Sequence, residues 1–367
     1  MKILVDIGHP AHVHFFKNFI KEMDKRGHSF LITARDKDVA KNLLDKYGFE
    51  YTIISERNGG LSDNKFFELV KRDYKIFKFA KKFKPDILMG IGGENVAHVS
   101  KLTKAKSVVF TDTEHAKTIN SLTFPFADTI CTPSCFKNDL GKKHIRYNGY
   151  HELAYLHPNY FTPNPAVLDE IGLGEDDTFI ILRFVSWNAS HDVGQHGIQD
   201  RTALVRELER YGQVFITSEG RLDGGLAKYQ IKVAPEKMHD LMYYATLLYG
   251  ESATMASECA VLGTHAIYCD FAGRGYTDEE EAKYGLVYNF KLDEASIRSS
   301  LEKAVELLGD NNLKSVGRKK REKLLADKID VTAFMVWFVE NYPKSFKEVK
   351  ENVKVQEWFM GGDENVT

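Results

Sequence analysis

The first fourteen residues read MKILVDIGHPAHVH. The apolar run at 3–7 has the length and the β-branched content of a buried strand, and a polar loop connects it to a helical pattern at 13–26. Gly27 ends that pattern, as glycine commonly does just past a helix end. A second strand is predicted at 29–33, so the chain begins with a β-α-β unit.

The same alternation continues through the rest of the chain. Strands that alternate with helices predict parallel, doubly wound sheets with right-handed crossovers, which is the α/β class. Further strands are predicted at 51–54, 85–90, 107–110, 129–131, 145–147, 179–182, 213–217, 231–233, 246–249, 266–269 and 287–289.

The chain has 367 residues, which is too long for one ordinary domain. A stretch at 157–165 that is rich in Pro and Asn interrupts the alternation and is typical of a linker. We therefore expect one doubly wound domain at 1–156 and a second at 166–329. The strongly apolar helical pattern after the second domain predicts that 330–367 packs back onto the first.

Composition and charge narrow the possible partners. Lysine and arginine (50) nearly balance aspartate and glutamate (52), so the net charge of −2 gives no electrostatic basis for binding nucleic acid. No apolar run reaches the ~18 residues of a membrane-spanning helix, while attachment to a membrane surface stays open. Four cysteines in so long a chain favour a reducing, cytoplasmic location. The oligomeric state is not indicated.

Ligands of open parallel sheets bind beyond the carboxyl ends of the strands, so the loops after the strands are the candidates for a site. The first of these loops follows Gly8 with His9, His12 and His14, and it is neither a dinucleotide fingerprint nor a P-loop. Because the pKa of histidine lies near neutrality, His12 is our candidate for a general base that deprotonates a hydroxyl. Capping or surface histidines are the alternative.

A second loop of the first half is rich in glycine. Gly92 and Gly93 allow the backbone to approach a ligand closely, and Glu94 and Asn95 stand where the next helix is expected to begin. The alternative is a tight turn with a helix cap.

A third loop carries two carboxylates, Asp112 and Glu114, after the predicted strand at 107–110. Alternate residues of an extended segment share a face, so these side chains could point together. Such a pair can have its pKa values pushed apart for acid–base work. A solvated loop is the alternative.

The most specific segment of the second half follows the predicted strand at 246–249. Ser252, Ala253 and Thr254 stand where the next helix begins, and free N–H groups and hydroxyls at a helix start suit a diphosphate. Glu258 lies one turn further on and could accept both hydroxyls of a ribose. A helix cap would explain Ser252 or Thr254 but not Glu258.

Two more loops could contribute to a nucleotide site in the second half. Arg274 stands between two glycines after the strand at 266–269 and could meet a phosphate or a sugar acid, or lie in an exposed loop. Arg183 and Ser186 follow the strand at 179–182 and could contact a nucleotide or shape the loop.

Over nearly its full length the sequence resembles a prokaryotic family known as a domain of unknown function. That family is grouped with GT-B-fold glycosyltransferases and UDP-N-acetylglucosamine 2-epimerases. The loop at 8–13 looks like the glycine-rich loop of the peptidoglycan N-acetylglucosaminyltransferase, with His12 on its proposed base. Ser252 and Glu258 have the spacing of a donor-site motif in which a serine holds the diphosphate and a glutamate holds the ribose.

The epimerases supply a second likeness. The segment 111–116 is similar to an epimerase segment, with Glu114 on its catalytic acid, and Glu94 sits near another epimerase acid. The resemblance thus implies a GT-B fold with two Rossmann-like domains, the first for an acceptor and the second for a nucleotide sugar.

Three functions follow as hypotheses. The leading one is glycosyl transfer from a UDP-type donor without a metal or a cofactor, in which helix-start N–H groups stabilise the leaving diphosphate. Such an enzyme would serve the synthesis of cell-surface polysaccharides. The second is 2-epimerisation of a UDP-N-acetylhexosamine by Glu94, Asp112 and Glu114. The third is nucleotide-sugar binding without catalysis.

Overall fold

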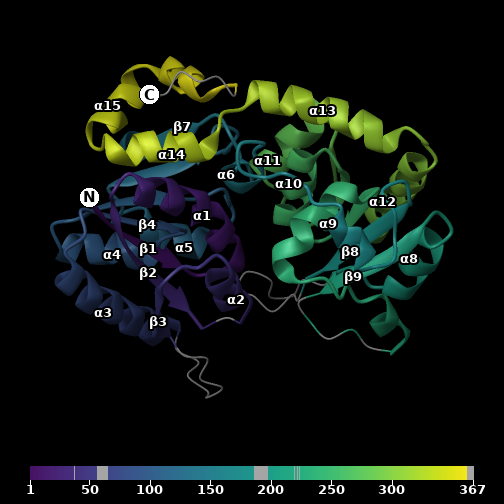
Figure 1. Ribbon diagram of the computed structural model, residues 1–367, viewed down its shortest axis with the longest axis horizontal. Coiled ribbons are helices and arrows are strands. Elements are labelled where there is room, and N and C mark those ends of the chain that lie inside the picture. The colour runs from purple at the N-terminus through teal and green to yellow at the C-terminus, as the bar shows by residue number, and fades with distance from the viewer. Residues whose placement is uncertain are drawn as a thin grey trace. The chain divides into compact units, whose positions relative to one another are not determined.

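The computed structural model describes residues 1–36, 38–55, 65–185, 197–218, 220, 222 and 224–361. Contacts divide the chain into two units (Figure 1). Unit 1 consists of Met1–Tyr155 together with Lys328–Thr367, and unit 2 consists of Leu156–Asp327. The chain therefore leaves unit 1 once and returns to it for its last helices.

Unit 1 is built on a seven-stranded sheet in which every pairing is parallel, which confirms the predicted doubly wound class. The order is β3-β2-β1-β4-β5-β6-β7, so the strand order reverses between β1 and β4. A reversal of this kind separates the loops that follow the two strands and leaves room for a ligand. The strands are β1 (Lys2–Ile7), β2 (Ser29–Arg35), β3 (Tyr51–Ser55), β4 (Ile87–Ile91), β5 (Lys106–Phe110), β6 (Thr129–Pro133) and β7 (His144–Tyr147).

Helices connect these parallel strands. The first, α1 (Pro10–Lys25), begins before the predicted residue 13, because proline fits the first helical position and Nδ1 of His9 accepts the N–H of Ala11 at 3.2 Å. The other helices of this unit are α2 (Asp38–Lys46), α3 (Lys65–Phe83), α4 (Glu94–Leu102), α5 (Lys117–Thr123), η1 (Gly141–Lys143), α14 (Val331–Glu340), α15 (Lys344–Glu351) and η5 (Val353–Phe359), and α6 (Leu153–Leu156) spans the boundary between the units.

The late helix α14 is part of the core of unit 1 and lies beside α1 (Figure 1). It is almost wholly apolar, and the ring of its buried Phe334 lies 6.0 Å from the ring of Tyr147. Asp330 caps the helix by accepting the N–H of Ala333 at 2.9 Å. Each large side chain buried here contributes roughly 1.5–3 kcal/mol, so the chain's last segment is a large part of the stability of unit 1.

Unit 2 contains a five-stranded sheet, also parallel throughout, in the order β12-β11-β10-β8-β9. Here the order reverses between β8 and β10. Its strands are β8 (Phe179–Phe184), β9 (Gln213–Ser218), β10 (Leu247–Gly250), β11 (His265–Cys269) and β12 (Val287–Phe290).

The strand predicted at 231–233 is wrong. The chain there makes only an isolated bridge, between Ile216 and Gln230, because a three-residue segment with a lysine at its centre is too short to extend a ladder along the edge strand β9. The helices of this unit are α7 (Ala166–Asp169), α8 (Arg201–Leu208), η2 (Gly224–Tyr229), η3 (Pro235–Lys237), α9 (Met238–Tyr244), α10 (Ala253–Leu262), α11 (Gly275–Glu279), η4 (Glu280–Tyr284), α12 (Glu294–Leu308) and α13 (Leu313–Asp327).

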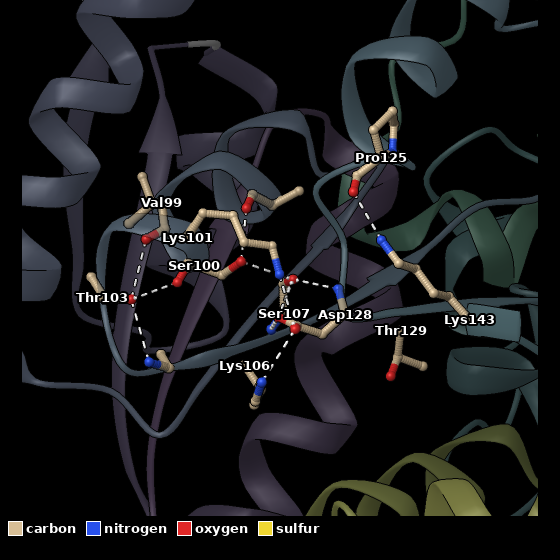
Figure 2. Close-up of polar contacts among 12 residues, drawn as sticks. Val99, Ser100, Lys101, Thr103, Lys106, Ser107, Pro125, Asp128, Thr129 and Lys143 are labelled. Atoms are coloured by element: carbon tan, nitrogen blue, oxygen red, sulfur yellow. Dashed lines mark hydrogen bonds and ion pairs between the residues drawn. The ribbon is translucent and has the colours of Figure 1, made fainter.

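A carboxylate network ties the amino ends of β5 and β6 to the end of α4 (Figure 2). Oδ2 of Asp128 accepts the backbone N–H of Ser107 at 3.0 Å and its hydroxyl at 3.1 Å, and Oδ1 lies 2.9 Å from Nζ of Lys101 and 3.4 Å from Nζ of Lys106. Burial opposes ionisation, but these contacts outweigh it and lower the pKa of Asp128. The network lies at the amino ends of the strands, whereas the loops that are candidates for a site follow the carboxyl ends.

We expect Asp128→Asn to lower the free energy of unfolding by about 1–3 kcal/mol near neutral pH, because the ionised acceptor is lost. A folded-state pKa below the unfolded value gives stability that is present above the unfolded pKa and is lost as pH falls through the folded pKa. Urea unfolding between about pH 6 and about pH 3 should therefore show the two proteins converging. Asp24→Asn, on the exposed side of α1, is the control, and a constant gap across this range would contradict the assignment.

Candidate functional site

The loops after β1 and β4 lie on either side of the reversal of strand order in unit 1. The turn after β4 needs glycine: Gly93 has φ 66°, and a Cβ there would lie 2.6 Å from Cγ1 of Val109. The turn ends at Gly93, and Glu94 is the first residue of α4. Oε1 of Glu94 lies 2.9 Å from a guanidinium nitrogen of Arg35 and 3.6 Å from one of Arg72. The predicted loop residues Gly92 and Gly93 thus form the turn that leads to Glu94, and Glu94 forms a charged cluster with Arg35 and Arg72.

We call the region around the loops after β1 and β4 the β1–β4 corner, and two further residues of it are deeply buried. Asn95 is 1% exposed, and neither its Oδ1 nor its Nδ2 has a hydrogen-bond partner in the described part of the chain. Asp6, in β1, accepts a hydrogen bond from the hydroxyl of Thr33 at 2.7 Å, and burial raises its pKa although Arg35 opposes the shift. Unsatisfied polar atoms in a protein interior are uncommon, so Asn95 calls for an explanation.

The three histidines after β1 have different environments. His9 is exposed and caps α1, and His12 is half-buried. His14 is buried, with Nδ1 3.3 Å from the hydroxyl of Tyr47 and its ring stacked 5.4 Å from that of Tyr155. The structure therefore places His14 in the core rather than on the ligand-facing loop, because α1 has already begun at Pro10.

His12 turns back onto the loop. Its Nδ1 accepts the N–H of Gly8 at 3.2 Å. In the neutral ring this hydrogen bond places the proton on Nε2, so His12 can accept a proton only at Nδ1, after the contact with Gly8 is released. Its role as a base stays a prediction.

The carboxylates after β5 contact different elements. Oδ2 of Asp112 pairs with Nδ1 of His151 at 2.9 Å, whereas Oε1 of Glu114 accepts the N–H of Lys137 at 3.1 Å. Burial lowers the pKa of His151, but Asp112 more than offsets this, and the pKa is raised. The sequence analysis missed His151; the signal was a polar stretch directly after the predicted strand at 145–147.

In unit 2 the predicted nucleotide segment begins where β10 ends. Ser252 is the N-cap of α10, and its Oγ accepts the N–H of Met255 at 3.3 Å. Ser252 and Thr254 are half-buried, whereas Ala253 between them is buried. The helix start therefore keeps polar surface, but the hydroxyl of Ser252 already serves as the cap.

Glu258 is buried one turn beyond the start of α10. It is 6% exposed, and its Oε1 lies 2.9 Å from Nε2 of His239, which belongs to α9 and is also buried. The carboxylate that is expected to hold a ribose thus contacts a side chain of its own unit, and its role in ribose binding stays a prediction.

Glu251 is a buried residue of this region to which the sequence analysis gave no role. Its Oε2 accepts the N–H of Val185 at 2.9 Å, and its Oε1 accepts the N–H of Ile198 at 2.6 Å. The carboxylate of Glu251 thus holds the backbone at both Val185 and Ile198, which follow β8, beside the start of α10. An acidic residue directly between a strand and a capping serine was the available signal.

The two arginines predicted for this site also have partners. Arg274 forms an ion pair with Oδ2 of Asp270 at 2.7 Å, so it does not lie in a freely exposed loop. Arg183 donates from Nη1 to the hydroxyl of Thr217 at 3.2 Å. Ser186 lies outside the described residues.

The comparisons with known proteins agree with this architecture. Residues 1–342 match the family described as "Protein of unknown function (DUF354)". The chain belongs to the DUF354 family. An uncharacterized protein of Methanocaldococcus jannaschii is 24% identical to this DUF354 chain over 282 residues, which cover 73% of the chain and 82% of that protein.

Solved structures show the same fold at low identity. The UDP-GlcNAc 2-epimerase of Methanocaldococcus jannaschii has a TM-score of 0.60 and 15% identity, with 88% of the DUF354 chain and 99% of the epimerase covered. The Neisseria meningitidis UDP-GlcNAc 2-epimerase, bound to UDP-GlcNAc, has a TM-score of 0.56 and 13% identity, with 88% of the DUF354 chain and 100% of the epimerase covered. The spinosyn rhamnosyltransferase SpnG, complexed with thymidine diphosphate, has a TM-score of 0.63 and 14% identity, with 93% of the DUF354 chain and 100% of SpnG covered. The predicted GT-B fold is confirmed.

The helices and the His, Cys, Asp and Glu side chains of the described residues bear on membranes and metals. No helix in these ranges combines the length and the apolar character needed to cross a bilayer. Within the same ranges, no group of three or more His, Cys, Asp or Glu side chains is arranged to hold a metal ion.

Proposed function

We propose that this DUF354 protein is an enzyme that transfers a sugar from a nucleotide-diphosphate donor, with UDP the expected nucleotide. The donor diphosphate would bind at the start of α10, and the acceptor would bind at the β1–β4 corner of unit 1. The observation that carries the proposal is that the reversal of strand order between β8 and β10 coincides with a capped helix start. Two of the similar structures hold UDP-GlcNAc and thymidine diphosphate, which supports the class of ligand.

The physical basis is electrostatic. The first N–H groups of a helix have no partner within the helix and carry the positive end of its dipole, so they favour phosphate oxygens. The helix itself holds these N–H groups in place before the ligand arrives, and Glu251 holds Val185 and Ile198, which follow β8, next to the same point. Donors held in advance stabilise the charge of a departing diphosphate without reorganisation.

Transfer is favoured over epimerisation by the partners of the carboxylates in unit 1. Glu94 contacts two arginines, and Asp112 pairs with His151. Both carboxylates thus contact side chains of their own unit, whereas an acid or base of epimerisation has to contact the substrate. His12 remains the proposed base for the acceptor hydroxyl, with Nδ1 as the nitrogen that takes the proton.

Ser252→Asp provides a sharp test of the donor site. Aspartate is as good an N-cap as serine, so the unliganded protein should melt at nearly the same temperature. Its charge at the helix start should nevertheless repel a diphosphate and weaken UDP binding by about tenfold or more, as measured by calorimetry. Ser252→Asn, which caps without charge, is the matched control and should bind UDP almost normally.

Three results would reject the proposal. Equal UDP affinity in the Asp and Asn variants would remove the start of α10 from the site. Conversion of UDP-GlcNAc to its 2-epimer without an acceptor would replace transfer by epimerisation, and UDP-sugar binding without turnover across an acceptor screen would favour a non-catalytic binding protein.

A further inference from the structure

The corner between β1 and β4 contains two guanidinium groups around one carboxylate. Arg35 is the last residue of β2, and Arg72 comes from α3. Both contact the same atom, Oε1 of Glu94, at 2.9 and 3.6 Å. One carboxylate oxygen cannot satisfy the forked donors of two arginines, since each guanidinium offers five N–H groups.

Donors are in fact left over. The Nε atoms of Arg35 and Arg72 are buried and have no hydrogen-bond partner in the described part of the chain, and the same holds for both polar side-chain atoms of Asn95. Asn95 adjoins Glu94 and is 1% exposed. Buried donors without acceptors cost free energy, and the two arginine Nε atoms beside one carboxylate indicate a group that is bound there in the working protein.

The electrostatics favour an anion. Burial lowers the pKa of Arg72, and the nearby positive charge of Arg35 lowers it further, although Glu94 and Asp6 oppose this. Two further acids act on Arg72, and both have partners: Asp6 accepts the hydroxyl of Thr33, and Asp73 pairs with His98 at 2.8 Å. A further negative group would relieve the repulsion between the two arginines.

The loop after β1 packs against Arg35. A Cβ built on Gly8 would be in van der Waals contact with both neighbours, 3.5 Å from Cζ of Arg35 and 3.5 Å from Cε1 of His12. The side chain of Arg35 is 29% exposed, so part of it faces solvent and can be reached by a ligand. Gly8, His12 and Arg35 therefore lie together beside this exposed part.

We infer that Arg35 and Arg72 bind an anionic oxygen group, a phosphate or a carboxylate, at this corner. Planar guanidinium forks match both groups through paired, charge-assisted hydrogen bonds. The inference rests on the proposed function in one respect: the group belongs to the acceptor, so that the acceptor is a phosphorylated or acidic sugar or lipid carrier rather than a neutral one. His12 would then stand beside the bound acceptor.

The test uses the full chain carrying Ser252→Asp, so that phosphate binding at α10 does not contribute. Binding of inorganic phosphate, glucose 1-phosphate, glucuronate and neutral glucose is measured by calorimetry. Phosphate or carboxylate probes should bind, glucose should not, and Arg35→Gln should weaken the anions by about tenfold. Lys104→Gln, an exposed cation in the same unit, should leave binding unchanged.

Arg35→Lys and Arg72→Lys guard against a folding defect, because each keeps the charge beside Glu94 and removes the paired geometry. Weakened anion binding in these folded variants supports the site. Equal affinity for anions and glucose, or equal affinity in all variants, overturns it. The proposed function fails separately, through UDP binding that is unaffected by Ser252→Asp.

Discussion

Glu258→Ala should lower the free energy of unfolding by about 3 kcal/mol, because it deletes the carboxylate that a buried histidine contacts. Glu258 and His239 are both almost fully buried and lie 2.9 Å apart, on α10 and α9. Alanine removes this buried hydrogen bond and puts no polar group in its place. Urea unfolding of the variant, followed by far-UV circular dichroism, would measure the loss.

Glu258→Gln separates this role from ribose binding. Glutamine can still contact His239, so it should recover much of the lost stability. If Glu258 instead holds a ribose in the folded protein, Glu258→Ala should retain normal stability and lose only UDP affinity. Glu294→Ala, at a fully solvated position on α12, should change neither quantity and serves as the control.

Gly317→Ala should also destabilise unit 2, although alanine is the better helix former. Gly317 lies within α13, where exchanging glycine for alanine normally gains about 1 kcal/mol. A Cβ at this position would collide with the carbonyl oxygen of Gly263, the residue that ends α10. Backbone atoms cannot rotate away as a flexible side chain can, so α10 and α13 would have to separate.

We expect a net loss of about 1–3 kcal/mol for Gly317→Ala, since the overpacking penalty exceeds the gain in helix propensity. The measurement is the midpoint of thermal or urea unfolding. Gly225→Ala is the matched control, because a Cβ there meets no atom within 4 Å. A Gly317→Ala protein as stable as the parent would show that the two helices separate at little cost.

Most of the fold could be predicted because parallel strands leave a clear trace in the sequence. The strand at 3–7 and its counterparts are buried on both faces, so they form apolar runs that alternate with helical patterns. The errors arose where the local signal was weak. The start of α1 was set by a capping histidine, which is outside the usual set of caps, and the segment 231–233 has β propensity but is too short to extend the single bridge that Gln230 makes to β9.

For the candidate site, the sequence could predict which loops are involved but not which side chains contact one another. The loops containing Gly8, Gly93 and Ser252 were identified because ligand loops follow strands. The pairings that decide their chemistry were not, because they join residues far apart in sequence. Arg35 meets Glu94 across β1, and α9 brings His239 to Glu258. The order of strands and helices determines these partners, and no spacing within one segment reveals it.

The return of the chain to unit 1 has a consequence for synthesis on the ribosome. Unit 2 is one continuous segment and can close its sheet as soon as it has emerged. Unit 1 must wait for Lys328–Thr367, because α14 covers α1 with apolar side chains such as Phe334. Until then the nascent chain carries an uncovered apolar surface. A chain that ends before Lys328 would therefore contain a complete unit 2 and an incomplete unit 1, although most of unit 1 is synthesised first.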